Sequence, residues 1–142
     1  MFLGPLALIA AAMFAGAAFY INFAEHPARM KLPAAAALMQ WKPAYKRGFI
    51  MQSSLAIAGF VLGMAAWWQT GDWRWVAGAV AMIASWPFTL AVIMPVNHVL
   101  GATEPSAAND ETLGLMARWN ALHAVRTALG MTAAAIFLWA LA

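Results

Sequence analysis

The sequence predicts an all-α membrane protein, a bundle of four transmembrane helices with a short interfacial helix between the first two spans. Of the 142 residues, 65% are hydrophobic and 9% are charged, whereas soluble domains carry about 25% charged residues. Four apolar stretches each exceed the ~18 residues needed to cross the hydrocarbon core, and none alternates as a transmembrane β-strand does. The chain has no cysteine, which excludes disulfides, thiolate metal sites and cysteine nucleophiles.

We expect a single membrane domain over residues 1–142, with spans at about 2–24, 48–69, 75–98 and 119–141. The first three spans contain no charged side chain, and the fourth is apolar apart from Asn120, His123 and Arg126. The first stretch is rich in Ala, as a cleaved secretory signal can be. However, no Lys or Arg precedes it, and it is longer than the usual signal core of about 7–15 residues. We therefore expect it to be retained as a true span.

Basic residues are distributed unevenly between the two membrane faces. If successive spans alternate in direction, Arg126 lies just inside the basic face, and the opposite face holds only Arg74. The connections of the basic face contain Arg29, Lys31, Lys42, Lys46, Arg47 and Arg118. An excess of Lys and Arg marks cytoplasmic loops, so this face is expected in the cytoplasm and both termini outside. The expected location is the inner or plasma membrane, with the lipid bilayer as partner. The net charge of +3 then reflects topology, and no nucleic-acid partner is expected.

The two cytoplasmic connections are long. The first, residues 25–47, contains the Ala-rich segment 34–42 between prolines. We expect this segment to form the short interfacial helix, with Trp41 and Tyr45 anchored at headgroup level. Residues 102–117 are polar and predict a loop followed by a helix that Asn109 or Asp110 caps.

Two spans carry features that affect packing. Pro87 and Pro95 lie in the third span, and we expect both to kink it. Gly59 and Gly63 form a GxxxG motif in the second span, which allows close approach of two helix backbones. We expect this motif to pack within the bundle, with a homo-oligomer as the alternative.

All three histidines are expected at the cytoplasmic end of the bundle. His26 follows the first span, His98 ends the third and His123 begins the fourth, with Glu25 at the same depth. Imidazole nitrogens bind Zn, Cu or Fe, and three histidines leave one position open for water or dioxygen. One hypothesis is therefore a metal site of His26, His98, His123 and Glu25 that holds Cu or Fe. Proton transfer without any metal, or a purely structural cluster, are the alternatives.

Arg126 is the most costly of these polar residues. It lies about two turns inside the fourth span, where a cation costs about 2.5–3.5 kcal/mol on insertion scales. Trp119, His123 and Arg126 follow each other at i, i+4 and i+7 and so form one stripe along a helix. We expect Arg126 to face the bundle interior with Glu25 as its partner; the alternative is a side chain that extends to the interface.

Two short runs carry a resemblance to a known family. MPVNHVL at residues 94–100 and WNALHAVRT at residues 119–127 resemble a family of small integral membrane proteins described as anthrone oxygenase-like. The Glu25-His26-Pro27 sequence is also similar to that family. The resemblance implies a four-helix membrane protein, and some fungal relatives oxidise an anthrone to an anthraquinone with dioxygen. It also implies a catalytic site lined by Asn97, Trp119, His123 and Arg126, with His26 facing them.

The residues and the resemblance together favour a membrane-embedded oxygenase. Its substrate would be a small apolar or aromatic molecule that enters from the lipid. His123 or His26 would remove a proton, and Arg126 would stabilise the resulting anion. The alternatives are a non-enzymatic protein that binds a metal or haem, a small-molecule transporter, and a structural subunit of a larger complex. Polar residues concentrated at one end of the bundle count against transport.

Overall fold

The computed structural model describes residues 2–142, which are helical apart from short connections and contain no strand. The chain forms four rods, and each is long and apolar enough to cross a membrane. The elements are α1 (Leu3–Tyr20), η1 (Ile21–Glu25), α2 (His26–Arg29), α3 (Ala34–Thr70), α4 (Trp73–Ile83), α5 (Ser85–Phe88), η2 (Thr89–Ile93), α6 (Met94–Ala102), η3 (Pro105–Ala107) and α7 (Asp110–Leu141). The all-α fold class is therefore confirmed.

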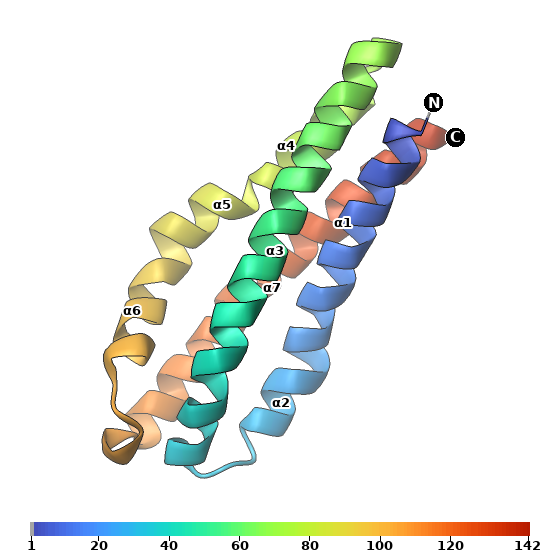
Figure 1. The fold of residues 1–142 in the computed structure, drawn as a ribbon. Coiled ribbons are helices and arrows are strands. Elements are labelled where there is room, and N and C mark those ends of the chain that lie inside the picture. The colour runs from blue at the N-terminus through green and yellow to red at the C-terminus, as the bar shows by residue number, and fades with distance from the viewer. Residues whose placement is uncertain (1) are drawn as a thin grey trace.

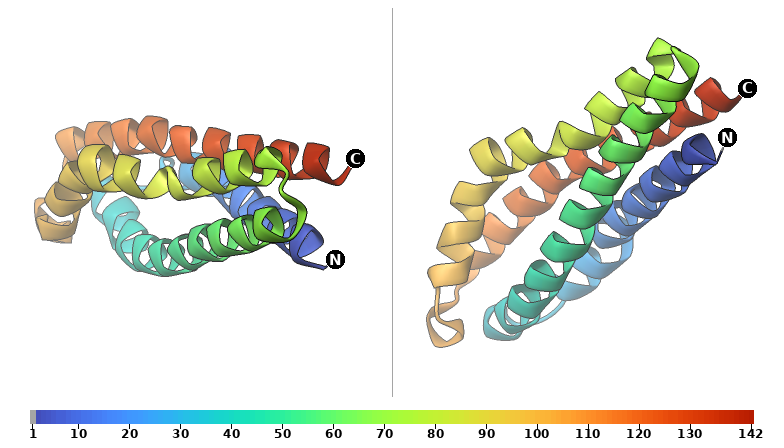
Figure 2. Two further views of the ribbon diagram at one scale, coloured as in Figure 1. Left: turned by 90° about the horizontal axis from the view of Figure 1, so that it is seen from above. Right: turned by 45° about the horizontal axis from the view of Figure 1, so that its top comes forward.

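The four rods lie side by side in an elongated bundle (Figure 1). The first rod packs against α3 and α7, and α4 packs against the same two helices. Both termini lie at the end of the bundle that also holds the tight turn between α3 and α4, as the turned views show (Figure 2). The two longer connections, at residues 30–33 and 103–109, lie at the opposite end.

Glycines let the helices approach closely in the half of the bundle near the termini. A Cβ on Gly78 would lie 2.4 Å from the Phe137 ring, and one on Gly63 would lie 2.9 Å from the same ring. A Cβ on Gly59 would lie 2.8 Å from Met82. The GxxxG motif of α3 thus packs against α4 and α7 within the bundle, as predicted.

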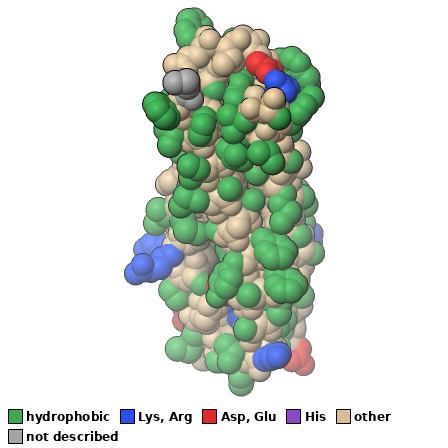
Figure 3. Space-filling model, turned by 90° about the vertical axis from the view of Figure 1, so that its right-hand side faces the viewer, with side chains coloured by type: hydrophobic (Ala, Val, Ile, Leu, Met, Phe, Trp, Pro, Cys, Tyr) green, Lys and Arg blue, Asp and Glu red, His purple; other side chains and the backbone are tan. Residues whose placement is uncertain are grey.

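The outer surface is apolar along most of its length, and this is what an integral membrane protein requires. Large hydrophobic side chains such as Ile9, Val61 and Leu138 are about half exposed, and Figure 3 shows such side chains spread over the visible face. Polar groups concentrate inside or at the ends of the rods instead. At the terminal end, Asp72 caps α4 and its carboxylate binds Arg74.

The predicted interfacial helix is helical but is not a separate element. Residues 34–42 are the first turns of α3, which continues without a break through Pro43. Trp41 is 1% exposed and packs in the bundle, so it is no headgroup-level anchor. The Ala-rich segment favours helix throughout, and the apolar ring of Trp41 finds a buried site that the sequence pattern does not reveal.

Two π-helical segments interrupt the first and third rods. η1 ends at Glu25 and η2 ends at Ile93, in each case two residues before a proline, Pro27 and Pro95. Proline cannot donate the i→i−4 hydrogen bond, and a π turn is one way for a helix to adjust around that loss. The third rod also breaks between α4 and α5 at Ala84, three residues before Pro87. The predicted interruptions of this span are confirmed, and Figure 1 shows the change of direction there.

Candidate functional site

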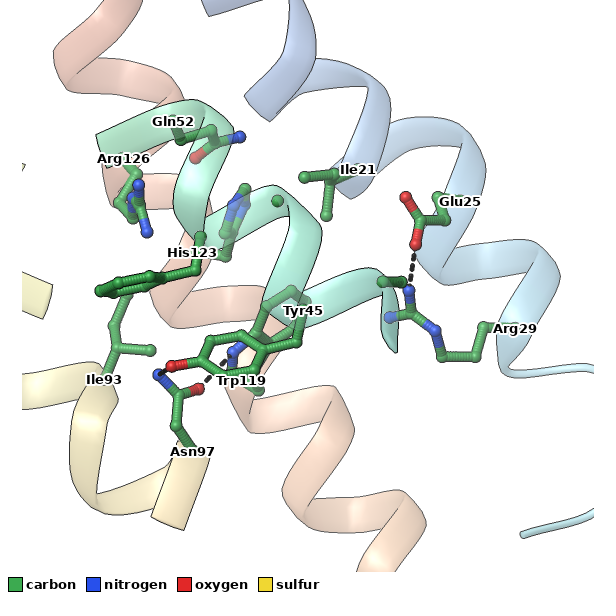
Figure 4. Close-up of a pocket in the computed structure, with 13 residues that line it drawn as sticks. Ile21, Glu25, Arg29, Tyr45, Gln52, Ile93, Asn97, Trp119, His123 and Arg126 are labelled. Carbon is green, nitrogen blue, oxygen red and sulfur yellow. Dashed lines mark hydrogen bonds and ion pairs between the residues drawn. The ribbon is translucent and has the colours of Figure 1, made fainter. Parts of the chain in front are cut away.

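A pocket lies in the half of the bundle away from the termini, between the first rod, α3, η2–α6 and α7 (Figure 4). Its empty space, including the open mouth, is about 400 Å³. The polar residues that line it come from all four rods: Glu25, Arg29, Tyr45, Gln52, Asn97, Trp119, His123 and Arg126. All four catalytic residues that the sequence predicted, Asn97, Trp119, His123 and Arg126, line this one pocket.

His123 is held in one tautomer by Asn22. The Asn22 amide nitrogen donates to the Asn120 backbone oxygen at 2.9 Å and to its side-chain oxygen at 2.7 Å. The Asn22 Oδ1 is therefore an acceptor, and it receives the Thr127 hydroxyl at 2.6 Å. His123 Nδ1 lies 3.0 Å from the same oxygen, so it must carry the hydrogen. Nε2 is left with a lone pair that can accept a proton.

Asn97 links the ring of Trp119 to that of Tyr45. The Trp119 indole N–H donates to Asn97 Oδ1 at 2.8 Å, and the Asn97 amide donates to the Tyr45 oxygen at 3.2 Å. Tyr45 stacks on Trp41 with the ring centroids 4.8 Å apart, and Trp119 stacks on His123 at 5.1 Å. The four rings are thus fixed by stacking and by one buried amide. Figure 4 shows this hydrogen-bonded group on one side of the pocket.

A second polar group, on the first rod, lines another side of the pocket. Arg29 forms an ion pair with Glu25 and also donates to Gln40. Its guanidinium lies 3.4 Å from His26 Nδ1 and 6.0 Å from the centroid of the Trp119 ring. Because arginine only donates, His26 Nδ1 is the acceptor in this contact. His26 therefore supports Arg29 and does not itself line the pocket.

Arg126 has no counter-ion among the described residues. It is 7% exposed, its Nε has no hydrogen-bond partner, and its guanidinium carbon lies 5.7 Å from the Phe14 ring centroid. The prediction that Glu25 pairs with Arg126 is wrong, because Glu25 binds Arg29 one helical turn away on the same rod. Gln52 is 1% exposed, and both polar atoms of its amide are also unpartnered. Both side chains line the pocket, and Figure 4 shows them on the side away from Asn97.

The residues expected to bind a metal are not brought together. His98 is exposed on the outside of α6, whereas His26 and His123 are buried. Glu25 is engaged with Arg29, and the described residues contain no group of three or more His, Asp or Glu that could hold a metal ion. The expected set of His26, His98, His123 and Glu25 therefore does not fit Cu or Fe.

Three site residues were not identified from the sequence. The sequence predicts Tyr45 as an interfacial anchor and Arg29 as a topology signal, and it assigns no role to Gln52. The signal for Gln52 was present, because an amide inside an apolar span has to be satisfied within the protein or by a ligand. Tyr45 and Arg29 carried no such signal, because both types are common at membrane interfaces.

Comparison with known proteins identifies the family. The family model described as Anthrone oxygenase matches residues 41–136, about two thirds of the chain. This range contains Tyr45, Gln52, Asn97, Trp119, His123 and Arg126. No curated protein and no solved structure matches the chain. The chain, a bundle of four membrane-span-like helices, belongs to the anthrone oxygenase family.

Proposed function

We propose that this protein is a membrane-embedded oxygenase that oxidises a small, apolar aromatic substrate of the anthrone class with dioxygen. The observation that carries the proposal is one pocket that holds both a buried arginine without a counter-ion and a histidine with a free Nε2. Leaving a buried charge unpaired costs free energy, and such residues in membrane spans are usually functional. The pocket is expected to lie at the cytoplasmic end of the bundle.

An anthrone suits these two groups. Its CH2 group lies between two aromatic rings and opposite a ketone, so loss of one proton moves negative charge onto the ketone oxygen. Neutral His123 accepts the proton at Nε2, while Asn22 holds the resulting imidazolium through Nδ1. The Arg126 guanidinium and the Gln52 amide, both without hydrogen-bond partners, stabilise the charge on oxygen.

Dioxygen then completes the reaction. A C–O bond forms between dioxygen and the carbanion carbon, and the proton returns from His123 to give a hydroperoxide. Removal of the second hydrogen from that carbon and cleavage of the O–O bond release one water. The CH2 group becomes a ketone, one dioxygen is consumed, and the four electrons lost by carbon are the four that dioxygen gains.

The aromatic residues hold the flat substrate. Trp119 lines the pocket and is held in place by Asn97 and by stacking on His123, so it offers the substrate a fixed aromatic wall. Preorganised contacts of this kind lower the entropy lost on binding. Asn97 and Trp119 thus act in binding, and His123 and Arg126 in chemistry.

The test uses the protein purified in mild detergent. Anthrone oxidation is followed by the visible absorption of the quinone and by dioxygen uptake, with the spontaneous rate subtracted; one dioxygen per quinone is expected. His123→Ala should lower kcat by about 10²–10⁴-fold, and Arg126→Ala by about 10²–10³-fold. The matched control is Arg118→Ala, an exposed arginine of the same helix, which should keep full activity.

Circular dichroism and gel filtration establish that each variant is folded. Full activity in a folded His123→Ala or Arg126→Ala variant would rule out the proposed roles. A haem absorption band in the purified protein, together with no turnover, would instead favour the non-enzymatic alternative.

A further inference from the structure

A second pocket lies on the other side of Arg126, between α3, α5 and η2. Its empty space, including the part that opens to the outside, is about 270 Å³, and Ser53, Ser85, Trp86, Thr89 and Leu90 are among the residues that line it. Phe49 and Arg126 line both this pocket and the one that contains His123. The two pockets therefore adjoin at these two side chains.

The inner wall of the second pocket carries an unused hydroxyl. Thr89 is 5% exposed, and its hydroxyl has no hydrogen-bond partner. Threonine hydroxyls in helices commonly bond to a carbonyl three or four residues earlier. Thr70 and Thr103 of this protein do so, at 2.9 Å and 2.8 Å. Thr89 opens the π-helical segment η2 and does not, so its hydroxyl is free for a ligand.

One other group of this wall is also suited to a ligand oxygen. Arg126 Nε is buried without a partner and can donate. Ser85 donates its own hydrogen to the Met82 carbonyl at 3.0 Å, so it has no donor left for a ligand oxygen. An unpartnered polar atom in hydrocarbon costs several kcal/mol, and a ligand carbonyl could satisfy two such donors at once.

The outer rim of the second pocket is apolar and faces outward. Leu90 is 56% exposed and Trp86 is 36% exposed, and both lie on the surface of a rod that is long and apolar enough to cross the membrane. An apolar rim next to lipid with polar donors behind it matches a molecule that is mostly hydrocarbon and carries one oxygen. It does not match a charged or sugar-like ligand, which would lose its hydration at this rim.

We propose that the second pocket is a lateral entry site for an aromatic carbonyl compound, which docks from the bilayer with its oxygen on Thr89 and Arg126 before it reaches His123. The choice of ligand class rests on the proposed function. The site itself is inferred from the unpartnered donors of the inner wall and from the exposed apolar side chains of the rim. The same carbonyl chemistry belongs to the anthrone substrate and to the anthraquinone product, so entry and exit are tested separately.

The experiment measures both ligands on four variants, and a fifth variant serves as the fluorescence reference. Leu90→Trp fills the rim, and Leu138→Trp is its matched control, a leucine that is 60% exposed on the outside of α7 and lines neither pocket. Thr89→Val removes the hydroxyl at constant size, and Thr89→Ser keeps it. The KM for anthrone reports entry of substrate. Quenching of tryptophan fluorescence by anthraquinone, compared with Trp86→Phe, reports binding of product next to Trp86.

Leu90→Trp and Thr89→Val should raise both KM and the anthraquinone Kd, Thr89→Val by about 2–10-fold, the range for one lost hydrogen bond. Leu138→Trp and Thr89→Ser should match the wild type in both. If Leu90→Trp binds and turns over like Leu138→Trp, the entry site is overturned while the oxygenase function stands. If the wild type never oxidises anthrone but Leu90→Trp still abolishes anthraquinone quenching, the proposed function fails and the site stands.

Discussion

The unpaired charge of Arg126 leads to a prediction that separates function from stability. Substitution with Met keeps an unbranched side chain and removes the charge. A cation in a span costs about 2.5–3.5 kcal/mol on insertion scales. The only compensation found among the described residues is the Phe14 ring at 5.7 Å, and a cation–π contact contributes about 0.5–2 kcal/mol. Arg126→Met should therefore stabilise the folded protein by about 0.5–3 kcal/mol while it lowers kcat by about 10²–10³-fold.

The free energy of unfolding is measured by titration with a denaturing detergent in mixed micelles, followed by circular dichroism. Arg118→Met is the control, because an exposed residue of the same helix should change stability by less than about 0.5 kcal/mol. Quinone formation is measured on the same samples.

A variant that gains stability and loses activity would identify Arg126 as a residue retained for chemistry. The opposite result would refute the reasoning. If Arg126→Met is less stable than the wild type by about 1 kcal/mol or more, as typical destabilising substitutions are, the guanidinium stabilises the fold.

Two further predictions concern the half of the bundle near the termini. Gly78→Ala places a methyl group 2.4 Å from the Phe137 ring and should destabilise by about 1–3 kcal/mol. The control is Gly114→Ala in α7, where the added Cβ meets nothing within 4 Å; it should stabilise by about 0.5–1 kcal/mol in the same detergent titration. If the two substitutions change the free energy of unfolding equally, the close contact between Gly78 and Phe137 is contradicted. Hydrogen bonds from the Arg74 side chain and backbone hold the pKa of Asp72 below its ordinary value. Its stabilisation is therefore complete above the ordinary pKa and is lost as pH falls through the lowered one. Asp72→Asn should thus be less stable than the wild type near neutral pH and equal to it in strong acid; a constant difference across the pH titration would contradict this.

The fold was predictable because hydrophobicity decides it almost alone. The spans and the turn between α3 and α4 follow from the positions of apolar runs and of a few charged residues. The convergence of Asn97, Trp119, His123 and Arg126 also followed, because each lies at the same end of a rod. The resemblance to a family singled out the same four residues.

The partners within the site were not predictable in the same way. Glu25 and Arg29 are i, i+4 on one rod, and this short-range pair outcompetes the cross-bundle pair with Arg126 that depth alone suggested. His98 follows Asn97 directly, and neighbours on a helix point about 100° apart. With Asn97 3% exposed and bonded to Trp119, His98 has to face outward. Which of two adjacent polar residues faces inward depends on helix rotation, and the sequence does not state it.

That rotation is set by the π turn of η2, which carries one residue more than an α-helical turn would need. The extra residue acts as a register setting for everything that follows it in the third rod. If residues 89–93 continued as an α-helix instead, every later residue of the rod would be turned by about 100°, and the Asn97 amide would no longer face Trp119. The π turn thus decides which side chain of the third rod aligns the indole of the pocket, although it lies outside the residues that make this hydrogen bond.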